Sequence, residues 1–270
     1  LERLGLRVNT VLRFMPPDGT TRAFDLHGDP GLVRLDPSGY QAALRFAQSG
    51  FVHIMGGIDH LLFLLCLVIP FRKLLPLAAI VTAFTVAHSV TLIAAALGYG
   101  PDPLWFPPLV ETLIAISILY MAIENVLGSS LARRWMLTLA FGLAHGFGFA
   151  FGLREQLQFA GSHLITSLLA FNLGVELGQL LVLIVLVPAF GFLFRHIPER
   201  LGIILLSILV GHTAWHWTVE RGERLAQFPL PVIDPAFLAS AIRWLMVLLV
   251  FAGLAWTASA FLRRSRLRRH

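Results

Sequence analysis

Seven long apolar segments dominate the pattern of hydrophobic and polar positions from residue 51 onward. Each is close to the ~20 residues that a helix needs to cross a bilayer. The pattern predicts an all-α, polytopic membrane domain of seven transmembrane helices over residues 51–262. The predicted segments are 51–70, 74–98, 105–127, 135–153, 163–194, 201–219 and 236–262. The fifth is long enough to tilt in the bilayer or to break at Pro188.

The first 50 residues have a different pattern. Apolar and polar residues alternate over Leu6–Phe14 and again over Thr20–Leu26, on either side of the turn-forming residues Pro16–Gly19. This predicts a β-hairpin, followed by a short pre-membrane helix at Gly39–Gln48. Two strands alone are only marginally stable. Residues 1–50 are therefore expected to be the end of a larger β-rich region, and the chain a mature form or a fragment of a longer protein.

Cationic residues gather in alternate connections between the apolar segments. They are Arg72, Lys73, Arg133, Arg134, Arg195 and Arg200, together with the basic tail at residues 263–270. The intervening connections are poorer in net positive charge. By the positive-inside rule the N-terminus is outside and the C-terminus is cytoplasmic, which makes the β segment extracytoplasmic. We expect a multi-pass protein of the bacterial cytoplasmic (inner) membrane, whose basic tail sets the topology and can also contact anionic lipid.

Composition agrees with the hydrophobic pattern. The chain is 57% hydrophobic and 13% charged, whereas soluble domains carry about 25% charged residues. Cys66 is the only cysteine and lies in an apolar run, so no disulfide framework or thiolate metal cluster is expected. The expected partners are a metal ion and membrane lipid rather than nucleic acid, and the oligomeric state is left open.

The first apolar segment carries two histidines and an aspartate. Ionisable groups are costly inside a bilayer, so such a set is by default a candidate functional site. On one continuous helix His53 and His60 share a face, with Gly56 and Gly57 between them and Asp59 beside them. The alternative is a pair of idle histidines at the headgroup level. At the helical rise they would lie about 10 Å apart, so His60 is assigned to the site and His53 to capture at its entrance.

Other polar residues fall at a similar predicted depth on further segments. His212 and His216 are one turn apart, a spacing that often gives one metal two ligands. The candidate metal ligands are His53, Asp59, His60, His88, His145, Glu176, His212 and His216. Glu111, Asn172, Gln179 and Glu124 are candidates for supporting or pathway roles, although Glu124 also fits a structural role near the cytoplasmic interface. Imidazole and carboxylate together suit nickel, cobalt, zinc or iron, and the scarcity of sulfur ligands argues against copper(I).

These motifs resemble those of the HupE/UreJ membrane proteins. The matching elements are His53-x5-Asp59-His60, Ala87-His88-Ser89, Ala144-His145-Gly146 and Phe171-Asn172-x-Gly174-Val175-Glu176. The resemblance covers most of residues 50–220 and implies a nickel or cobalt permease, with His53, Asp59, His60 and His145 contacting metal. The shorter members have a second histidine and a glutamate where this chain has Phe141 and Gly148. The β segment and the seventh span indicate a longer branch of the family.

Three functions remain open at this point. The first, and favoured, is a divalent-metal permease, a transporter rather than an enzyme. The second is a membrane-embedded zinc-dependent hydrolase, because the segments also resemble, more loosely, the alkaline-ceramidase and adiponectin-receptor superfamily. The third is a sensor or scaffold that works through its outer β domain. A permease needs a polar route below the site, for which Glu124, Tyr120 and Gln179 are candidates. A hydrolase needs a closed floor and an opening for substrate.

Overall fold

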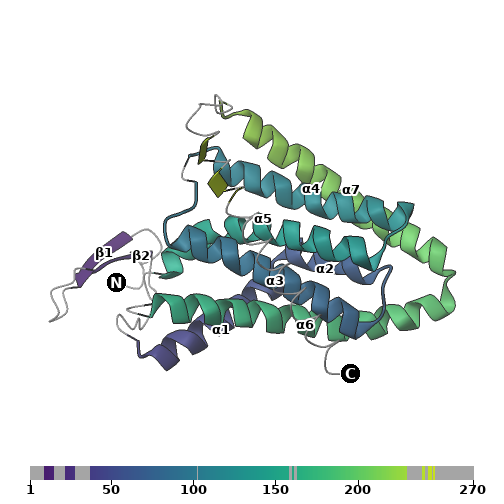
Figure 1. The fold of residues 1–270 in the computed structure, drawn as a ribbon, viewed down its shortest axis with the longest axis horizontal. Helices are drawn as coiled ribbons and strands as arrows, with labels where there is room; N and C mark the ends of the chain where they lie inside the picture. Colours follow the sequence, from purple (N-terminus) through teal and green to yellow (C-terminus); the bar gives the residue numbers. More distant parts are fainter. Residues whose placement is uncertain are drawn as a thin grey trace, which may run out of the picture. The chain divides into compact units, whose positions relative to one another are not determined.

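The fold is described from a computed structural model of the chain. The structure describes residues 9–14, 22–27, 37–101, 103–157, 160, 163–229, 239–240, 243–244 and 246. Two strands precede seven helices in the part of the chain that is described (Figure 1). The strands are β1 (Asn9–Phe14) and β2 (Arg22–His27); the helices are α1 (Gly39–Gly56), α2 (Ile58–Val68), α3 (Leu74–Ala96), α4 (Phe106–Leu127), α5 (Leu131–Leu157), α6 (Leu164–His196) and α7 (Glu199–Ala226).

The predicted hairpin is present. Strands β1 and β2 pair antiparallel, with Asn9 opposite His27 and Phe14 opposite Arg22. The alternation of apolar and polar residues therefore identified both strands correctly to within a few residues. The predicted turn at Pro16–Gly19 lies outside the described residues.

The first predicted span is wrong at its start and in its continuity. The pre-membrane helix does not end near residue 48, because α1 continues to Gly56. The chain then breaks at Gly57, whose backbone is extended (φ −84°, ψ 94°), and α2 begins at Ile58. The axes of α1 and α2 meet at a bend of 68°. Glycine is a poor helix former, and the Gly56–Gly57 pair is where this run of apolar residues changes direction.

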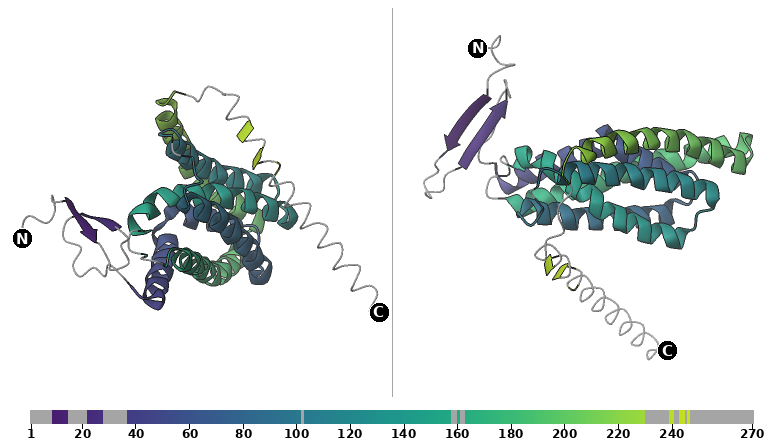
Figure 2. Two further views of the ribbon diagram at one scale, coloured as in Figure 1. Left: turned by 60° about the vertical axis from the view of Figure 1, so that its left-hand side comes forward. Right: turned by 90° about the horizontal axis from the view of Figure 1, so that it is seen from above.

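Helix-to-helix contacts order the bundle. The most extensive are between α1 and α6, between α3 and α5, and between α4 and α7; α3 also packs on α6, and α5 on α4. The short helix α2 contacts both α4 and α6, and lies inside the bundle (Figures 1 and 2). Segments distant in sequence thus surround α2, which carries His60.

Glycines allow the closest of these contacts. A Cβ atom at Gly50 would overlap the carbonyl oxygen of Phe171, and one at Gly174 would overlap that of Ala47. Helices α1 and α6 therefore meet backbone to backbone. On α5, Gly142 packs against Phe84 in the same way, and Gly146 against α3 one turn further on. Such small-residue contacts are the usual means by which helices associate in membranes.

Long apolar helices make this a membrane protein. Among the described residues, α3, α4, α6 and α7 are each long and apolar enough to cross a bilayer, and the bent pair α1–α2 qualifies if it is taken as one broken span. Helix α6 stays continuous through Pro188, so the predicted alternative of a break there is wrong. Helix α7 extends to Ala226, beyond the predicted end at residue 219. The seventh predicted span lies almost entirely outside the described residues, so the count of seven and the topology stay predictions.

Candidate metal site

Four histidines from four different helices converge inside the bundle. They are His53 on α1, His60 on α2, His88 on α3 and His145 on α5. One ligand atom from each of His53, His60 and His88 lies within 4.8 Å of the others. The fourth ring, His145, lies 5.3 Å from that of His60, centroid to centroid. We call these four residues the histidine cluster.

The helix break at Gly57 explains how His53 joins the cluster. On a continuous helix His53 and His60 would be about 10 Å apart along the axis. The bend instead brings the two ring centroids to 4.7 Å. The prediction that His53 is too distant to share an ion with His60 is therefore wrong. A Cβ at Gly57 would press on the His53 carbonyl oxygen and on Nδ1 of His60, so the residue at the bend also has little space.

Hydrogen bonds orient two of the rings. Nδ1 of His88 lies 3.2 Å from Oδ1 of Asn172, and Nδ1 of His145 lies 2.8 Å from the carbonyl oxygen of Phe141. Asn172 donates through its own Nδ2 to the carbonyl of Leu168, so its Oδ1 is the acceptor. Both Nδ1 atoms therefore carry the proton, and both Nε2 atoms keep a free lone pair. Metal-binding histidines are commonly oriented in this way.

The Nε2 atoms of the four rings are buried without partners among the described residues. Nε2 of His53, His60, His88 and His145 is in each case inaccessible to solvent and makes no hydrogen bond among the described residues. His60, His88 and His145 are 7%, 0% and 1% exposed. A buried polar atom without a partner costs about 1–3 kcal/mol. Four such atoms of one chemical kind in one place indicate that a ligand completes the site.

Aromatic rings enclose the cluster on two sides. The ring of His53 lies 3.8 Å from that of Phe149, which in turn stacks on Phe171 at 4.7 Å. Helices α2, α3 and α5 each carry a phenylalanine one helical turn from their histidine of the cluster. All three phenylalanines lie on the side of the α2–α3 connection. These three are Phe63, Phe84 and Phe141, the aromatic floor. The ring centroid of Phe63 lies 5.3 Å from that of Phe84 and 6.1 Å from that of Phe141. These rings fill the centre of the bundle on the side of the cluster that faces the α2–α3 connection.

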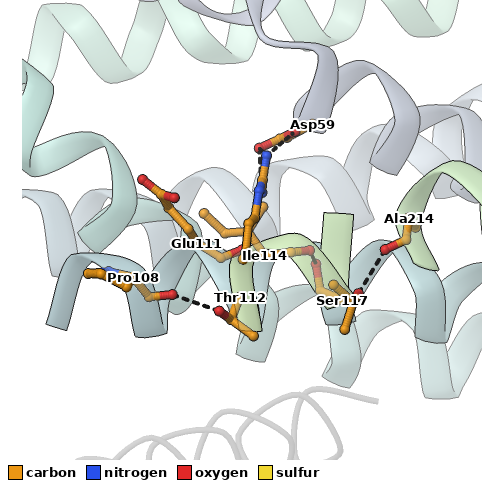
Figure 3. A network of polar contacts seen from close by, with 9 residues as sticks. Asp59, Pro108, Glu111, Thr112, Ile114, Ser117 and Ala214 are labelled. Carbon is orange, nitrogen blue, oxygen red and sulfur yellow. Dashed lines mark hydrogen bonds and ion pairs between the residues drawn. The ribbon is translucent and has the colours of Figure 1, made fainter. Parts of the chain in front are cut away.

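A cavity of about 440 Å³ opens beside the cluster on the opposite side from the floor. Its lining includes His53, His60 and His145 together with Asp59 and Glu111. The cavity therefore reaches the cluster from the end of the bundle where α4 begins and α7 ends, while the Nε2 atoms themselves stay buried. The carboxylates of Asp59 and Glu111 extend toward this region from facing helices (Figure 3).

Asp59 is ion-paired rather than free. Arg221 on α7 donates to both of its carboxylate oxygens at 3.1–3.3 Å, and also to the backbone carbonyl of Glu111 at 3.2 Å. The guanidinium lies over the ring of Trp217, 5.1 Å from its centroid. Arg221 and Trp217 thus form part of the cavity wall. In this structure the carboxylate of Asp59 is engaged by arginine, and its role as a metal ligand stays a prediction.

The structure places the other predicted residues outside the cluster. Glu176 accepts a hydrogen bond from Thr82 at 2.6 Å, and Gln179 accepts one from Thr85 at 2.8 Å. The ring centroids of His212 and His216 lie 4.6 Å apart, but both side chains are exposed on α7. They line no part of the cavity that reaches the cluster. They therefore do not replace the histidine and glutamate that shorter family members have at the positions of Phe141 and Gly148.

Glu124 is buried at the opposite end of the bundle. It is 4% exposed and pairs with Arg133 at 3.3 Å and with the fully buried Arg134 at 2.8 Å. Arg134 also binds Asn125 and the carbonyl of Met121. These two ion pairs fit the structural role that was one of the two interpretations of Glu124.

Sequence reasoning missed Arg221, Trp217 and the aromatic floor. Arg221 gives no signal in the sequence, because the neighbouring Glu220 and Glu223 balance its charge within the same connection. Its partner Asp59 is 162 positions away, a pairing that no local pattern reveals. A signal for the floor does exist: each phenylalanine is three or four positions from a histidine, on the same helix face.

Comparison with known proteins now gives the family. No curated protein and no solved structure matches the chain. A family model described as HupE / UreJ protein matches residues 32–221. This range includes all four histidines, both helices that meet at Gly57, and Arg221 as its last residue. On this match the chain belongs to the HupE/UreJ family.

Proposed function

We propose that this protein is a permease for a divalent transition-metal ion, nickel or cobalt, in the bacterial cytoplasmic membrane. The family is associated with such transport, as the resemblance of the motifs already implied. The metal is the cargo, and the histidine cluster is its binding site within the membrane. Neutral imidazole is a ligand that suits both ions, as well as zinc.

The observation that carries the proposal is the set of four buried, unpartnered Nε2 atoms. Two of the rings are held in the tautomer that a metal requires, by Asn172 and by the Phe141 carbonyl. A set of structural histidines would satisfy these nitrogens with protein acceptors or donors. Among the described residues, hydrogen bonds engage Nδ1 of His88 and of His145, whereas Nε2 of all four rings has no partner.

The cavity defines the direction of entry. With the topology predicted from the arginines, the end where α4 begins faces outward, so an ion enters from outside past Glu111 and Asp59. The aromatic floor separates the cluster from the cytoplasmic half. A transporter that alternates access is closed on one side when it is open on the other, so an open cavity above a closed floor corresponds to an outward-open state.

Zinc-dependent hydrolysis is the alternative that the cavity also favours, because about 440 Å³ is more space than one ion needs. Such an enzyme requires a general base close to the metal-bound water. Asp59, the nearest acid in sequence to the cluster, is engaged by Arg221 through both oxygens. That pairing makes transport the better supported of the two functions.

Uptake into proteoliposomes tests the proposal. The full chain, purified and reconstituted, is expected to accumulate radioactive nickel or cobalt ions, whereas His60→Ala is expected to abolish uptake. His212→Ala is the matched control, since it removes an imidazole that is exposed on α7, and it is expected to transport at the wild-type rate. No uptake by the wild type, combined with zinc-dependent hydrolysis of a lipid amide or ester, would establish the alternative.

A further inference from the structure

An ion held by the histidine cluster has no direct path through the centre of the bundle. Phe63 and Phe84 are each 2% exposed and lie in contact below the cluster. Phe84 also packs against His145 at 5.1 Å. Ring faces offer no oxygen or nitrogen ligands to a divalent ion, so an exit route must run beside the aromatic floor. The inference below rests on the proposed transport function.

A seam of polar contacts passes the floor between α3 and α6. It starts at the cluster itself, where His88 binds Asn172 at 3.2 Å. It continues away from the cavity as Thr85 bonded to Gln179 and Thr82 bonded to Glu176. Asn172, Glu176 and Gln179 recur at intervals of four and three positions, so they share one face of α6. The seam therefore extends about 10 Å along that helix.

Glu176 stands out among the described helix carboxylates that are not exposed to solvent. Asp59 is paired with Arg221, and Glu124 with Arg133 and Arg134. No cationic side chain among the described residues pairs with Glu176, and its Oε2 is buried without a hydrogen-bond partner. Only Oε1 is engaged, by the Thr82 hydroxyl. A carboxylate in a membrane domain without a cation is costly, and its free oxygen indicates a cationic ligand.

We propose that Glu176, with the hydroxyl oxygen of Thr82 that binds it, forms a second binding station for the transported divalent ion. It lies one helical turn, about 6 Å along α6, beyond Asn172. Oxygen ligands hold nickel or cobalt more weakly than imidazoles do. A weaker second site suits release, because passage requires that an ion bind well enough to enter and loosely enough to leave. The ion thus moves from the cluster along the α3–α6 seam.

The other polar group below the cluster is a poor route for a cation. Glu124 already has two arginine partners, and Arg134 is fully buried beside it. The two guanidinium charges exceed the single carboxylate charge, so a divalent cation is repelled there. Glu176, by contrast, has no cationic partner among the described residues, and its Oε2 makes no hydrogen bond.

Glu176→Gln separates the second station from the first. In the reconstituted full chain, the affinity of the cluster for nickel ions at equilibrium should stay within about threefold of wild type. The initial uptake rate should fall at least about tenfold, because the variant loses a charge that stabilises the ion in transit. Thr82→Val, which removes only the hydroxyl donor, should slow uptake by a smaller factor. Glu223→Gln, which changes an exposed glutamate on α7, is the matched control and should change neither quantity.

Two outcomes would overturn the second station. Uptake at the wild-type rate by both Glu176→Gln and Thr82→Val would remove Glu176 from the route while leaving the transport function intact. Loss of equilibrium binding as complete as that of His60→Ala would place Glu176 in the first site instead. Failure of transport itself is recognised separately, by the absence of uptake in the wild type.

Discussion

Two buried polar groups in this protein differ in whether the protein itself supplies their charged or polar partners. At one end of the bundle, Glu124 and Arg134 pair with each other, and Arg134 also binds Asn125 and the backbone of α4. At the other, the histidine cluster leaves Nε2 of all four rings without a partner in the described part of the chain. Both groups join several helices and both are nearly inaccessible to solvent. The first is complete as it stands and serves stability, whereas the second is completed by a ligand and serves binding.

The largest effect on stability is expected from breaking the complete group. Arg134→Met leaves Glu124 buried with only the half-exposed Arg133 as a partner. Removing one member of a buried ion pair costs about 3–5 kcal/mol. We expect the free energy of unfolding in detergent to fall by about that amount. The double variant Glu124→Gln/Arg134→Met should recover much of the loss, and equal stability of the single variant and wild type would show that the pair is not structural.

The largest effect on binding is expected from His60→Ala. The His60 ring is the one nearest to the other three, at 4.7, 5.3 and 6.4 Å from His53, His145 and His88. Loss of a supporting residue costs about 10–100-fold in metal affinity, so loss of a ligand should exceed about 100-fold. Titration calorimetry with nickel ions measures this change.

The same variant should have little effect on stability without metal. The cavity left by the imidazole destabilises the fold, but the variant also removes a buried nitrogen that had no partner, and these effects oppose each other. A fall of several kcal/mol in the free energy of unfolding of metal-free His60→Ala would instead assign the cluster to structure.

A smaller loss of affinity is expected when the orientation of His88 is released. Asn172→Leu removes the acceptor for Nδ1 of His88, so either nitrogen of that ring can carry the proton. Affinity for nickel ions should fall about 10–100-fold. Thr112→Val serves as the control, because Thr112 bonds only to the carbonyl of Pro108 on its own helix (Figure 3). Equal effects of the two variants would show a general response to loss of a helix hydrogen bond.

The smallest effect is expected at the mouth of the cavity. Asp59→Asn leaves the Arg221 charge uncompensated near the entrance, which disfavours a divalent ion by simple Coulomb repulsion. Because both side chains are partly exposed, at 27% and 18%, screening limits the loss of affinity to about tenfold or less. The double variant Asp59→Asn/Arg221→Gln should restore affinity. Failure to restore it would make Asp59 a direct ligand.

Local periodicity predicted the helices and strands more reliably than it predicted the break between α1 and α2 or the contacts between helices. Alternation identified both strands, and apolar runs located α3, α4, α5, α6 and α7. The break at Gly57 escaped prediction because glycine pairs also occur inside transmembrane helices, where they allow close packing. The error had a large consequence, since it placed His53 outside the site.

The candidate site was predictable only in part, for the same physical reason. Sequence spacing shows which residues share a helix face, but not what that face contacts. His212 and His216 do share a face, and α7 presents both to the exterior of the described bundle. The partnership of Asp59 with Arg221 depends on how α2 and α7 pack in three dimensions. His88 and His145 were identified because histidine inside an apolar segment is costly wherever it points.

X-ray absorption at the nickel or cobalt edge tests the central claim, that the four histidines form one metal site. With one equivalent of metal bound to the full chain, we expect at least three imidazole nitrogens at about 2.1 Å, the usual metal–imidazole distance. His60→Ala should lower the number of bound imidazole nitrogens by at least one, and His212→Ala should leave it unchanged. A shell of oxygen ligands without imidazole in the wild type, or the same number of imidazole nitrogens in His60→Ala as in the wild type, would contradict the assignment.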